Sequence, residues 1–331
     1  MAKKLKMFVY CFREFDEKVY WDALAEKYGF EYSYTDVLPS FETADLAAGC
    51  DSIVTTVNIL EPELLQKFKD LGVRYIQTRT IGYDHIDVNT AKALGLRVTH
   101  ITYPAEVVAD FAIMMILMGL RNMNHVLSAA SINDFSLPGK MGKNLYTCTV
   151  GVIGTGAIGT AVIKHLSSFG CRILTCSHHP NEELSRYCEF TDLDTIYSQS
   201  DVITLHVPSN DKNYHMINKR AFDMMKDDVL LVNTARGTLV DTDALIEALS
   251  SGKLRGACLD VIEQEQGLCY FDHSDKVLDN PHLEKLKSFP NVIFTAHTAF
   301  YTDVTIQSMA ENTVKAMYDL EEGRENPHII M

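Results

Sequence analysis

The segment TVGVIGTGAIGTAVIKHL, residues 149–166, restricts the possible folds more than any other part of the chain. It predicts a buried strand that ends in a tight turn, followed at once by a helix. Gly154 allows the tight turn, Gly156 lets the backbone approach a pyrophosphate, and Gly159 lets the helix pack closely on the strand. The first turn of the helix also offers amide donors for phosphate oxygens. An ordinary glycine-rich connection is the simpler alternative, but the strand–turn–helix order favours a dinucleotide site.

Apolar or β-branched runs alternate with helical patterns on both sides of this segment. Before it, LKMFVY, SIVTTV, VRYIQT and LRVTHI predict strands, and a long helix is expected over roughly residues 105–130. After it, RILTCS, VITLHV, VLLVNTA, GACLDV and NVIFTAH predict a second series of strands, and a last helix is expected with Thr302 or Asp303 as its cap. Such alternation indicates parallel sheets with crossover helices. The expected fold class is α/β, with two Rossmann-like, doubly wound parallel-sheet domains, the second inserted in the first.

The composition argues against several classes of protein. A formal net charge of −14 disfavours nucleic acid or an anionic membrane as partner, because phosphate binding needs clustered Lys and Arg. The 8 cysteines have no regular spacing, which fits a reducing, cytoplasmic location better than a disulfide framework. The apolar N-terminal run is followed at once by REFDEK and predicts a first strand rather than a signal peptide. The most apolar stretch, VADFAIMMILMGL, contains Asp110 and is too short to span a bilayer.

The strand after the glycine turn lacks the acid that usually holds the adenine-ribose hydroxyls of NAD. The chain has Ser177 there, followed by His178 and His179. A carboxylate would repel a 2′-phosphate, so its absence favours NADP, and the histidines can add positive charge. Alternatively, water or backbone groups hold the ribose and NAD binds. We therefore expect NAD or NADP, with a lean towards NADP. Cys176 and His178 share one strand face, but no third soft ligand lies at zinc-site spacing, and no metal site is expected.

Charged side chains follow three strands of the second series. Arg236 comes after one strand, Asp260 and Glu265 after the next, and His297 after the last. Ligands of an open parallel sheet bind outside the carboxyl ends of its strands, so these groups are expected to meet at one edge. Each has a simpler interpretation alone, as a surface ion pair, a solvated loop acid or a satisfied histidine. Together with the glycine turn they favour a catalytic set.

These residue types suit the reduction of a 2-oxo acid. The reaction needs a hydride at the carbonyl carbon and a proton at its oxygen. A histidine is the natural proton donor near neutral pH, and a neighbouring carboxylate stabilises its charged form. An arginine offers a forked, permanently charged clamp for the substrate carboxylate.

From the first strand to the last helix, the sequence resembles the D-2-hydroxyacid dehydrogenases, most closely their D-lactate dehydrogenase branch, which includes relatives found in vancomycin resistance. The motifs that carry the resemblance occur in family order: TRTIGYDHID, VGVIGTGAIG, LHVP, NTARG, LDVIEQE and HTAFYT. The resemblance implies that Arg236 binds the substrate carboxylate and carbonyl. It also implies that His297 is the general acid/base and that Glu265 pairs with it. It implies that Asp260 orients the nicotinamide carboxamide.

The resemblance also implies the remaining binding residues. The cofactor would contact Gly154, Gly156, Ala157, Ile158, Gly159, Ser177, His178, His206, Pro208, Thr234, Ala235 and Asp260. The substrate side would comprise Arg79, Ile81, Gly82, Tyr103, Phe300 and Tyr301, with the backbone at Ile81 and Gly82 cradling the carboxylate. Residues 1–103 and 298–331 would form the substrate domain, and residues 104–297 the cofactor domain. A homodimer is implied, with the long helix and the arm that follows it at the interface.

The sequence departs from the family at two places. Members that use NAD usually have Asp where this chain has Ser177, whereas the vancomycin-resistance relatives have Ser followed by a basic residue. Near Tyr103 the family often reads YSPNAIAE, whereas this chain reads YPAEVVAD. Because the proline is displaced by one position, we expect the local loop to differ from that of the family.

The pattern leaves the substrate open. Phe300, Tyr301 and Tyr103 either shape an apolar pocket or belong to the core. Pyruvate, giving D-lactate, is the first choice, and a bulkier 2-oxo acid such as 2-oxoisocaproate or phenylpyruvate is the alternative, since one methylene changes binding by only ~1–3 kcal/mol. From a different class, a dinucleotide-sensing binding protein or corepressor would keep the same fold.

Overall fold

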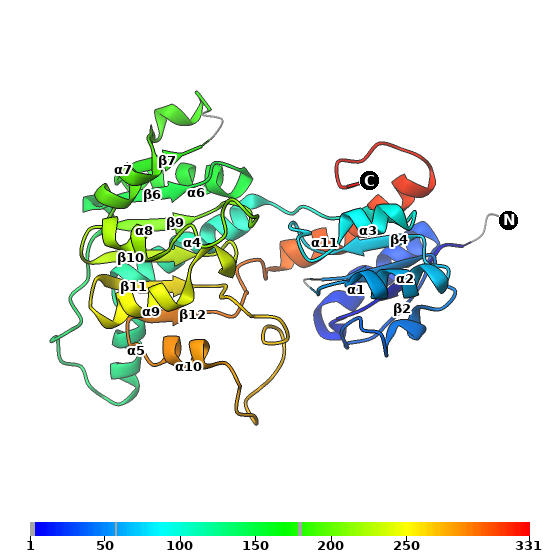
Figure 1. Cartoon of the computed structure of the whole chain (residues 1–331), viewed down its shortest axis with the longest axis horizontal. Helices are drawn as coiled ribbons and strands as arrows, with labels where there is room; N and C mark the ends of the chain where they lie inside the picture. The colour runs from blue at the N-terminus through cyan, green and yellow to red at the C-terminus, as the bar shows by residue number, and fades with distance from the viewer. Residues whose placement is uncertain (1–3, 57, 178–180) are drawn as a thin grey trace. The chain divides into compact units, whose positions relative to one another are not determined.

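The computed structural model describes residues 4–56, 58–177 and 181–331. The chain divides into two compact units, shown in Figure 1. Unit 1 comprises Met1–Pro104 and Tyr301–Met331, and unit 2 comprises Ala105–Phe300. The predicted division after residues 103 and 297 lies close to these boundaries.

Unit 1 is built on a five-stranded sheet in which every neighbouring pair is parallel. The strand order is β2-β1-β3-β4-β5. The strands are β1 (Lys6–Val9), β2 (Glu31–Tyr34), β3 (Ser52–Thr55), β4 (Tyr75–Thr78) and β5 (Arg97–Thr99). β3 and β4 are buried along their whole length, as expected of strands covered on both faces. The sequence EYSY of β2 lies at the sheet edge, is largely exposed and was not predicted as a strand.

Helices and the C-terminal tail complete unit 1. The helices are α1 (Glu14–Tyr28), α2 (Pro62–Asp70), α3 (Val88–Ala93) and α11 (Asp303–Glu321), with a 3₁₀ turn η1 (Ala44–Ala47). Thr302 is the N-cap of α11, because its hydroxyl accepts a hydrogen bond from the Thr305 amide at 3.3 Å. The tail then pairs with β5: the His100 amide donates to the His328 carbonyl, and the Ile330 amide to the Val98 carbonyl.

Unit 2 contains a seven-stranded sheet, again with parallel neighbours throughout. The order is β12-β11-β10-β9-β6-β7-β8. The strands are β6 (Thr149–Ile153), β7 (Arg172–Cys176), β8 (Glu189–Phe190), β9 (Val202–Leu205), β10 (Val229–Asn233), β11 (Leu254–Leu259) and β12 (Val292–Phe294). Strands β7 and β8 are added on one side of β6, and strands β9 to β12 are added on the other side. The strand order therefore reverses between β6 and β9, although all strands stay parallel. The predicted α/β class with two parallel-sheet domains is confirmed.

Alternate residues of β10 show why the sheet is covered on both faces. Val229 and Leu231 belong to one buried apolar cluster, and Leu230 and Val232 to another. Because side chains alternate across a strand, the two clusters lie on opposite faces. The first contains residues of α7 (Leu193–Gln199), α8 (Lys219–Met224), α9 (Thr242–Ser250) and α10 (Pro281–Lys287). The second contains residues of α4 (Ala105–Leu120) and α6 (Ala157–Ser167).

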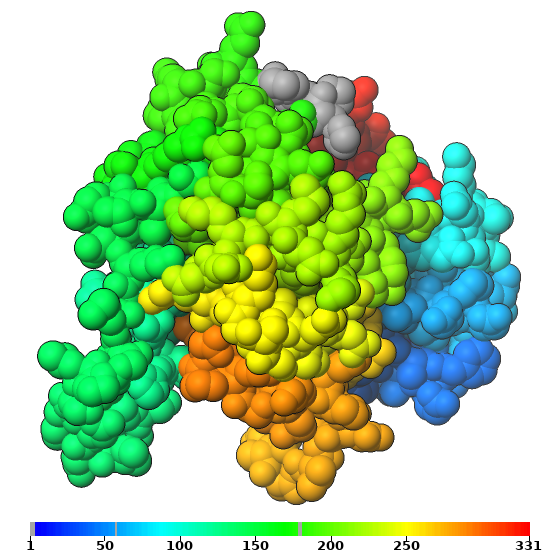
Figure 2. Space-filling model, turned by 60° about the vertical axis from the view of Figure 1, so that its left-hand side comes forward, coloured from blue at the N-terminus to red at the C-terminus, as the bar shows by residue number. Residues whose placement is uncertain are grey.

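The long helix expected over residues 105–130 is two helices. α4 ends at Leu120, and α5 (Met123–Ser131) begins after Asn122, whose φ of 51° is left-handed and breaks the helical path. We call residues 121–144, which include α5, the arm. Figure 2 shows it as a lobe that stands away from the rest of the surface of unit 2. Among the described residues, no helix has the length and apolar character needed to cross a membrane.

Candidate active site

The glycine turn follows β6, at the point between β6 and β9 where the strand order of unit 2 reverses. Gly154 has φ +104°, and a Cβ added to it would lie 2.5 Å from the His206 carbonyl oxygen. A Cβ on Gly159 would lie 2.0 Å from the Gly154 carbonyl oxygen, so α6 packs too closely on the turn for a side chain. A Cβ on Gly156 would meet nothing within 4 Å. The first and third glycines therefore serve packing, while Gly156 faces space that a ligand can occupy.

This open space fits a dinucleotide pyrophosphate. Gly156 is the N-cap of α6, so the amides of Ala157 and Ile158 have no partner within the helix and lie at its positive end. His206 follows β9, and its Nε2 lies 2.9 Å from the Thr204 hydroxyl. Desolvation lowers the pKa of His206 to about 3, so its ring is neutral at physiological pH. At this end of α6 the helix amides, rather than an imidazolium, are the groups available to donate to a phosphate.

Ser177 directly follows β7, whose last residue, Cys176, pairs in register with Ile153. It is half-buried at the end of the strand next to the glycine turn, the usual place of the ribose-binding acid. Burial raises the pKa of the Cys176 thiol to about 11, which keeps it protonated. His178 and His179 lie outside the described residues. Within residues 4–56, 58–177 and 181–331, no cluster of three or more His, Cys, Asp or Glu side chains is arranged to hold a metal ion.

Arg236 is presented by a turn that follows β10. The Asn233 side chain shapes the turn, since its amide donates to the Arg236 carbonyl at 2.8 Å and its oxygen accepts from the Ala235 amide at 3.0 Å. A Cβ on Gly237 would lie 2.1 Å from the carbonyl carbon and oxygen of Ile262. The turn that carries Arg236 therefore rests directly on the loop after β11. Thr234 adds a buried hydroxyl that has no hydrogen-bond partner among the described residues, as expected beside a ligand site.

Asp260 holds the turn after β12. Its side chain is buried, and its carboxylate accepts hydrogen bonds from the Thr295 hydroxyl (2.6 Å), the Thr298 amide (2.8 Å) and the Ala299 amide (3.0 Å). Its backbone oxygen accepts from the His297 amide at 2.6 Å. The structure thus gives Asp260 a role in positioning His297. Its expected contact with the nicotinamide stays a prediction.

The turn that carries His297 has an unusual backbone. Ala296 and His297 both have positive φ angles, 51° and 60°. Each such residue costs of the order of 1 kcal/mol or more when it is not glycine, and it persists only where surrounding contacts enforce it. The hydrogen bonds to Asp260 supply that enforcement. No pattern in the sequence predicts this conformation, since neither residue is glycine or asparagine.

His297 and Glu265 are paired. The His297 Nδ1 lies 2.7 Å from the Glu265 Oε1, and their side chains are 16% and 18% exposed. The other carboxylate oxygen of Glu265 accepts from the Ile262 amide at 3.2 Å. With Nδ1 directed at the carboxylate, Nε2 is the nitrogen that can exchange a proton with a substrate. The low exposure of both side chains strengthens their electrostatic interaction.

An aromatic pair lies beside this histidine. The Tyr270 ring centroid is 6.0 Å from that of His297 and 5.9 Å from that of Phe300, the latter in edge-to-face geometry. Phe300 was predicted and Tyr270 was not. Tyr270 belongs to an irregular loop that is far from His297 along the chain, so the sequence pattern could not predict their contact.

The candidate residues of unit 1 differ in accessibility. Arg79 follows β4, but its side chain is only 1% exposed. Its guanidinium forms an ion pair with Glu17 and donates to the carbonyls of Tyr10 (2.9 Å) and Cys11 (3.1 Å). The charge of this side chain is therefore engaged inside unit 1, and the expected place of Arg79 on the substrate side stays a prediction.

The backbone after Arg79 forms a loop that is fixed by side chains of unit 1. The Thr80 hydroxyl donates to the Gly82 carbonyl at 2.6 Å, and His100 Nδ1 lies 3.0 Å from the Ile81 carbonyl oxygen. Tyr103 is half-buried just before Pro104, at the end of the first segment of unit 1. Tyr301 is 45% exposed, and its hydroxyl donates to Asp16 at 2.5 Å.

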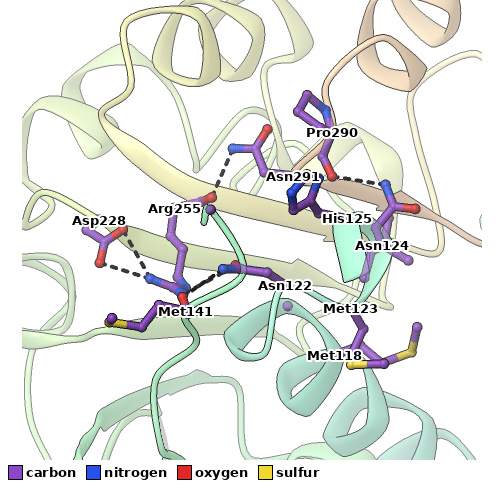
Figure 3. A pocket seen from close by; sticks show the side chains of 13 residues that line it. Met118, Asn122, Met123, Asn124, His125, Met141, Asp228, Arg255, Pro290 and Asn291 are labelled. Atoms are coloured by element: carbon purple, nitrogen blue, oxygen red, sulfur yellow. Dashed lines mark hydrogen bonds and ion pairs between the residues drawn. The ribbon is translucent and has the colours of Figure 1, made fainter. Parts of the chain in front are cut away.

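A pocket of about 360 Å³ lies elsewhere in unit 2, at the base of the arm (Figure 3). Its lining includes Asp228 before β10, Arg255 at the start of β11 and Asn291 before β12. It is therefore at the amino ends of the strands, the opposite edge from His297. Arg255 donates to Asn122 (3.3 Å) and to the Met141 carbonyl (3.2 Å), so this pocket belongs to the attachment of the arm.

Known proteins are similar to this chain over most of its length. Residues 113–299 match the family model described as D-isomer specific 2-hydroxyacid dehydrogenase, NAD binding domain. An aromatic 2-oxoacid reductase of Clostridium sporogenes is 40% identical over 323 residues, 96% of each chain. The D-lactate dehydrogenase of Escherichia coli is 37% identical over 327 residues, 98% of this chain and 99% of that one. The NAD-complexed crystal structure of a D-isomer specific 2-hydroxyacid dehydrogenase from Lactobacillus delbrueckii ssp. bulgaricus has a TM-score of 0.83 at 29% identity, covering 98% of this chain and 100% of that one.

Proposed function

The chain belongs to the D-isomer specific 2-hydroxyacid dehydrogenase family, and we propose that it reduces pyruvate to D-lactate with His297 as the general acid. As a member of this family, the chain is an NAD-dependent oxidoreductase. The observation that carries the proposed role of His297 is its 2.7 Å contact with Glu265 at the sheet edge that also presents Arg236.

NADH, when bound, supplies the hydride that is added to the carbonyl carbon of the substrate. The Arg236 guanidinium pairs with the substrate carboxylate and polarises the adjacent carbonyl. The His297 Nε2–H delivers its proton to the carbonyl oxygen as negative charge develops there. The Glu265 carboxylate stabilises the imidazolium before transfer and keeps Nδ1 protonated. In the reverse direction, neutral His297 accepts the proton of the hydroxyl group.

We assign the coenzyme subsite to the space beside Gly156, with the amides of Ala157 and Ile158 as phosphate donors. The family model and the coenzyme in the Lactobacillus relative favour NAD(H). The lean towards NADP that Ser177 suggested has no support from these comparisons, and our proposal is NADH. Thr234, Ala235, His206 and Pro208 line the same edge of the sheet in this assignment.

The substrate side is assigned by family resemblance. The backbone of Ile81 and Gly82, with Tyr103, would contact the 2-oxo acid, and residues 1–103 with 298–331 would act as the substrate domain. An aromatic 2-oxo acid is a second candidate substrate, for two reasons. Tyr270 and Phe300 place an apolar aromatic surface beside His297, and the clostridial relative is an aromatic 2-oxoacid reductase.

A panel of 2-oxo acids, each assayed with NADH and with NADPH, tests these assignments. We expect pyruvate with NADH to give the highest kcat/KM. A higher value for phenylpyruvate would favour the second candidate, and no turnover with any 2-oxo acid would contradict the function. His297→Ala should lower kcat by several orders of magnitude while leaving the NADH affinity close to that of the wild type. Near-normal turnover of this variant would remove His297 as the acid.

We also propose a homodimer formed through α4 and the arm. The arm exposes large apolar side chains, among them Phe135 (75%), Leu137 (84%) and Met141 (88%). Surface on this scale is rarely left in contact with water and marks an interaction site. Light scattering after size-exclusion chromatography should give a molar mass twice that of one chain. In the double variant Leu137→Asp/Met141→Asp the molar mass should fall to that of a single chain. A wild-type monomer would contradict the proposal.

A further inference from the structure

The loop after β11 carries a second histidine–carboxylate pair, two residues before Glu265. The Glu263 Oε1 lies 2.7 Å from the His215 Nε2, the same distance that separates Glu265 from His297. The His215 and Glu263 side chains are 27% and 18% exposed. Glu263 and Glu265 thus each hold an imidazole from a different part of the chain. Gln264, between them, has a left-handed φ of 57°, so the loop turns sharply at that point.

Glu263 is fixed on its other side by α9. Its Oε2 accepts from the Thr242 amide at 3.1 Å and from the Thr242 hydroxyl at 2.6 Å. Thr242 is the first residue of α9, so this carboxylate is at the positive end of the helix, where a negative charge is favourable. Both carboxylate oxygens of Glu263 are therefore engaged by groups that do not belong to its own loop.

His215 connects the same loop to the turn of Arg236. Its amide donates to the Thr238 carbonyl at 2.9 Å, two residues after Arg236, and its φ of 50° is also left-handed. Gly237 of this turn already rests on Ile262 with no room for a side chain. The His215–Glu263 contact therefore closes a ring of interactions around the turn of Arg236 and the loop of Glu265.

We propose that His215 and Glu263 are positioning residues, which fix the loop of Glu265 against the turn of Arg236 so that both groups meet the substrate correctly. This inference rests on the proposed function. The pair touches neither substrate nor coenzyme in this assignment, and acts through the backbone of residues 262–265 and 236–238. Among the described residues, the Glu265 carboxylate contacts the Ile262 amide and His297, so its position depends on how the loop itself is fixed.

The charged and titratable neighbours of both pairs define what a pH profile reports. His215 faces Glu263, Asp241 at 3.8 Å and the stacked Tyr214 ring at 3.9 Å. His297 faces Glu265 and Tyr270. Near Glu265, burial and then the charges of Glu265 and Asp260 raise the pKa of the Cys269 thiol to about 12, so this thiol does not titrate near neutrality.

The test compares Glu263→Gln, His215→Ala, His215→Gln and the double variant Glu263→Gln/His215→Ala. A matched control is Asp243→Asn, which removes the negative charge from the exposed 3.0 Å contact between Asp243 and His282; Asp243 is one residue beyond Thr242 on α9. We expect Glu263→Gln and His215→Ala to lower kcat about 10- to 100-fold, the effect of a misplacement near 1 Å. The KM for NADH should stay within about twofold, since these residues do not line the coenzyme site.

Two results separate positioning from a loss of stability. The pH above which reduction declines should fall in Glu263→Gln and His215→Ala, because a loosened Glu265 no longer keeps the proton on His297. His215→Gln, which can still donate to Glu263, should recover most of the activity, and the double variant should be no worse than the worse single one. A wild-type pH profile in both variants, or a kcat that falls only in proportion to the fraction of folded protein, would overturn the proposal.

A measurement without turnover distinguishes failure of this inference from failure of the function. Hydrogen exchange of residues 261–268 should be faster in Glu263→Gln and His215→Ala than in the wild type and in Asp243→Asn. Unchanged exchange would overturn the positioning role even in an active enzyme. If the wild type reduces no 2-oxo acid, the proposed function fails, whereas the exchange data still report whether the pair fixes the loop.

Discussion

Replacing Gly156 by alanine should weaken coenzyme binding without harming the fold. The backbone at Gly156 has φ −66° and ψ −170°, angles that alanine adopts without strain. The added methyl group would meet no protein atom within 4 Å. The substitution also reduces the conformational freedom of the unfolded chain, which stabilises a protein by ~0.4–1 kcal/mol when the native angles are compatible. The melting temperature should therefore stay the same or rise slightly.

The same methyl group would stand where the pyrophosphate must approach the first turn of α6. A hydrogen bond between an amide and a charged group contributes about 1.5–3 kcal/mol. If the phosphate is displaced far enough to lose one such bond, the Kd for NADH should rise roughly 10- to 150-fold. Fluorescence titration with NADH measures this change directly, and differential scanning calorimetry of the same sample measures stability.

Gly154→Ala is the matched control. Its Cβ would lie 2.5 Å from the His206 carbonyl at a φ of +104°, so this variant should lose about 1–3 kcal/mol of stability in addition to coenzyme affinity. The reasoning would be refuted if Gly156→Ala bound NADH as tightly as the wild type, because the open space would then not be the phosphate site. A large fall in its melting temperature would equally refute the claim that this glycine is not needed for packing.

Three further predictions address the ribose, the interior of unit 1 and the sheet of unit 2. Ser177→Asp should raise the ratio of kcat/KM for NADH to that for NADPH, and an unchanged ratio would show that another segment contacts the ribose. Arg79→Met should lower the free energy of unfolding in urea by about 3–5 kcal/mol, because it leaves the buried Glu17 carboxylate beside one fewer cation. A variant with unchanged stability and a raised KM for the 2-oxo acid would contradict the burial argument. For Asp201, desolvation is outweighed by hydrogen bonds from Lys226 and the Thr149 amide, and the pKa is lowered. Its carboxylate therefore stabilises the fold at neutral pH. The difference in unfolding free energy between the wild type and Asp201→Asn should disappear as the pH falls through that lowered pKa. A difference that stays constant down to acid pH would contradict this reasoning.

The strands that carry the candidate site could be predicted because β10 and β11 are almost fully buried and the edge strand β12, although partly exposed, is also apolar. The runs before Arg236, Asp260 and His297 are continuous and apolar, and their carboxyl ends meet at one edge of any parallel sheet. Simple pattern reasoning thus reached the grouping of these residues. The pairing of Glu265 with His297 came from family resemblance, since the spacing of two loop residues does not determine which side chains meet.

Other features could not be read from the sequence. An arginine after a strand has the same pattern whether it faces a ligand or a buried acid, so the burial of Arg79 required the fold. The left-handed Asn122, which divides the expected long helix, lies in a continuous helical pattern. The close contact of Gly237 with Ile262 depends on how two loops from different strands meet, and no local rule reports it.

The division of the chain also bears on its synthesis. Unit 2 is continuous, Ala105–Phe300, so all of its strands are synthesised before residues Tyr301–Met331. Unit 1 needs those residues, because α11 packs on α1 and the tail pairs with β5. The first segment to emerge is therefore among the last to reach its native state, and a nascent chain stalled before Tyr301 would expose the apolar surface that α11 covers. Such a chain is a natural client for a chaperone at the tunnel exit.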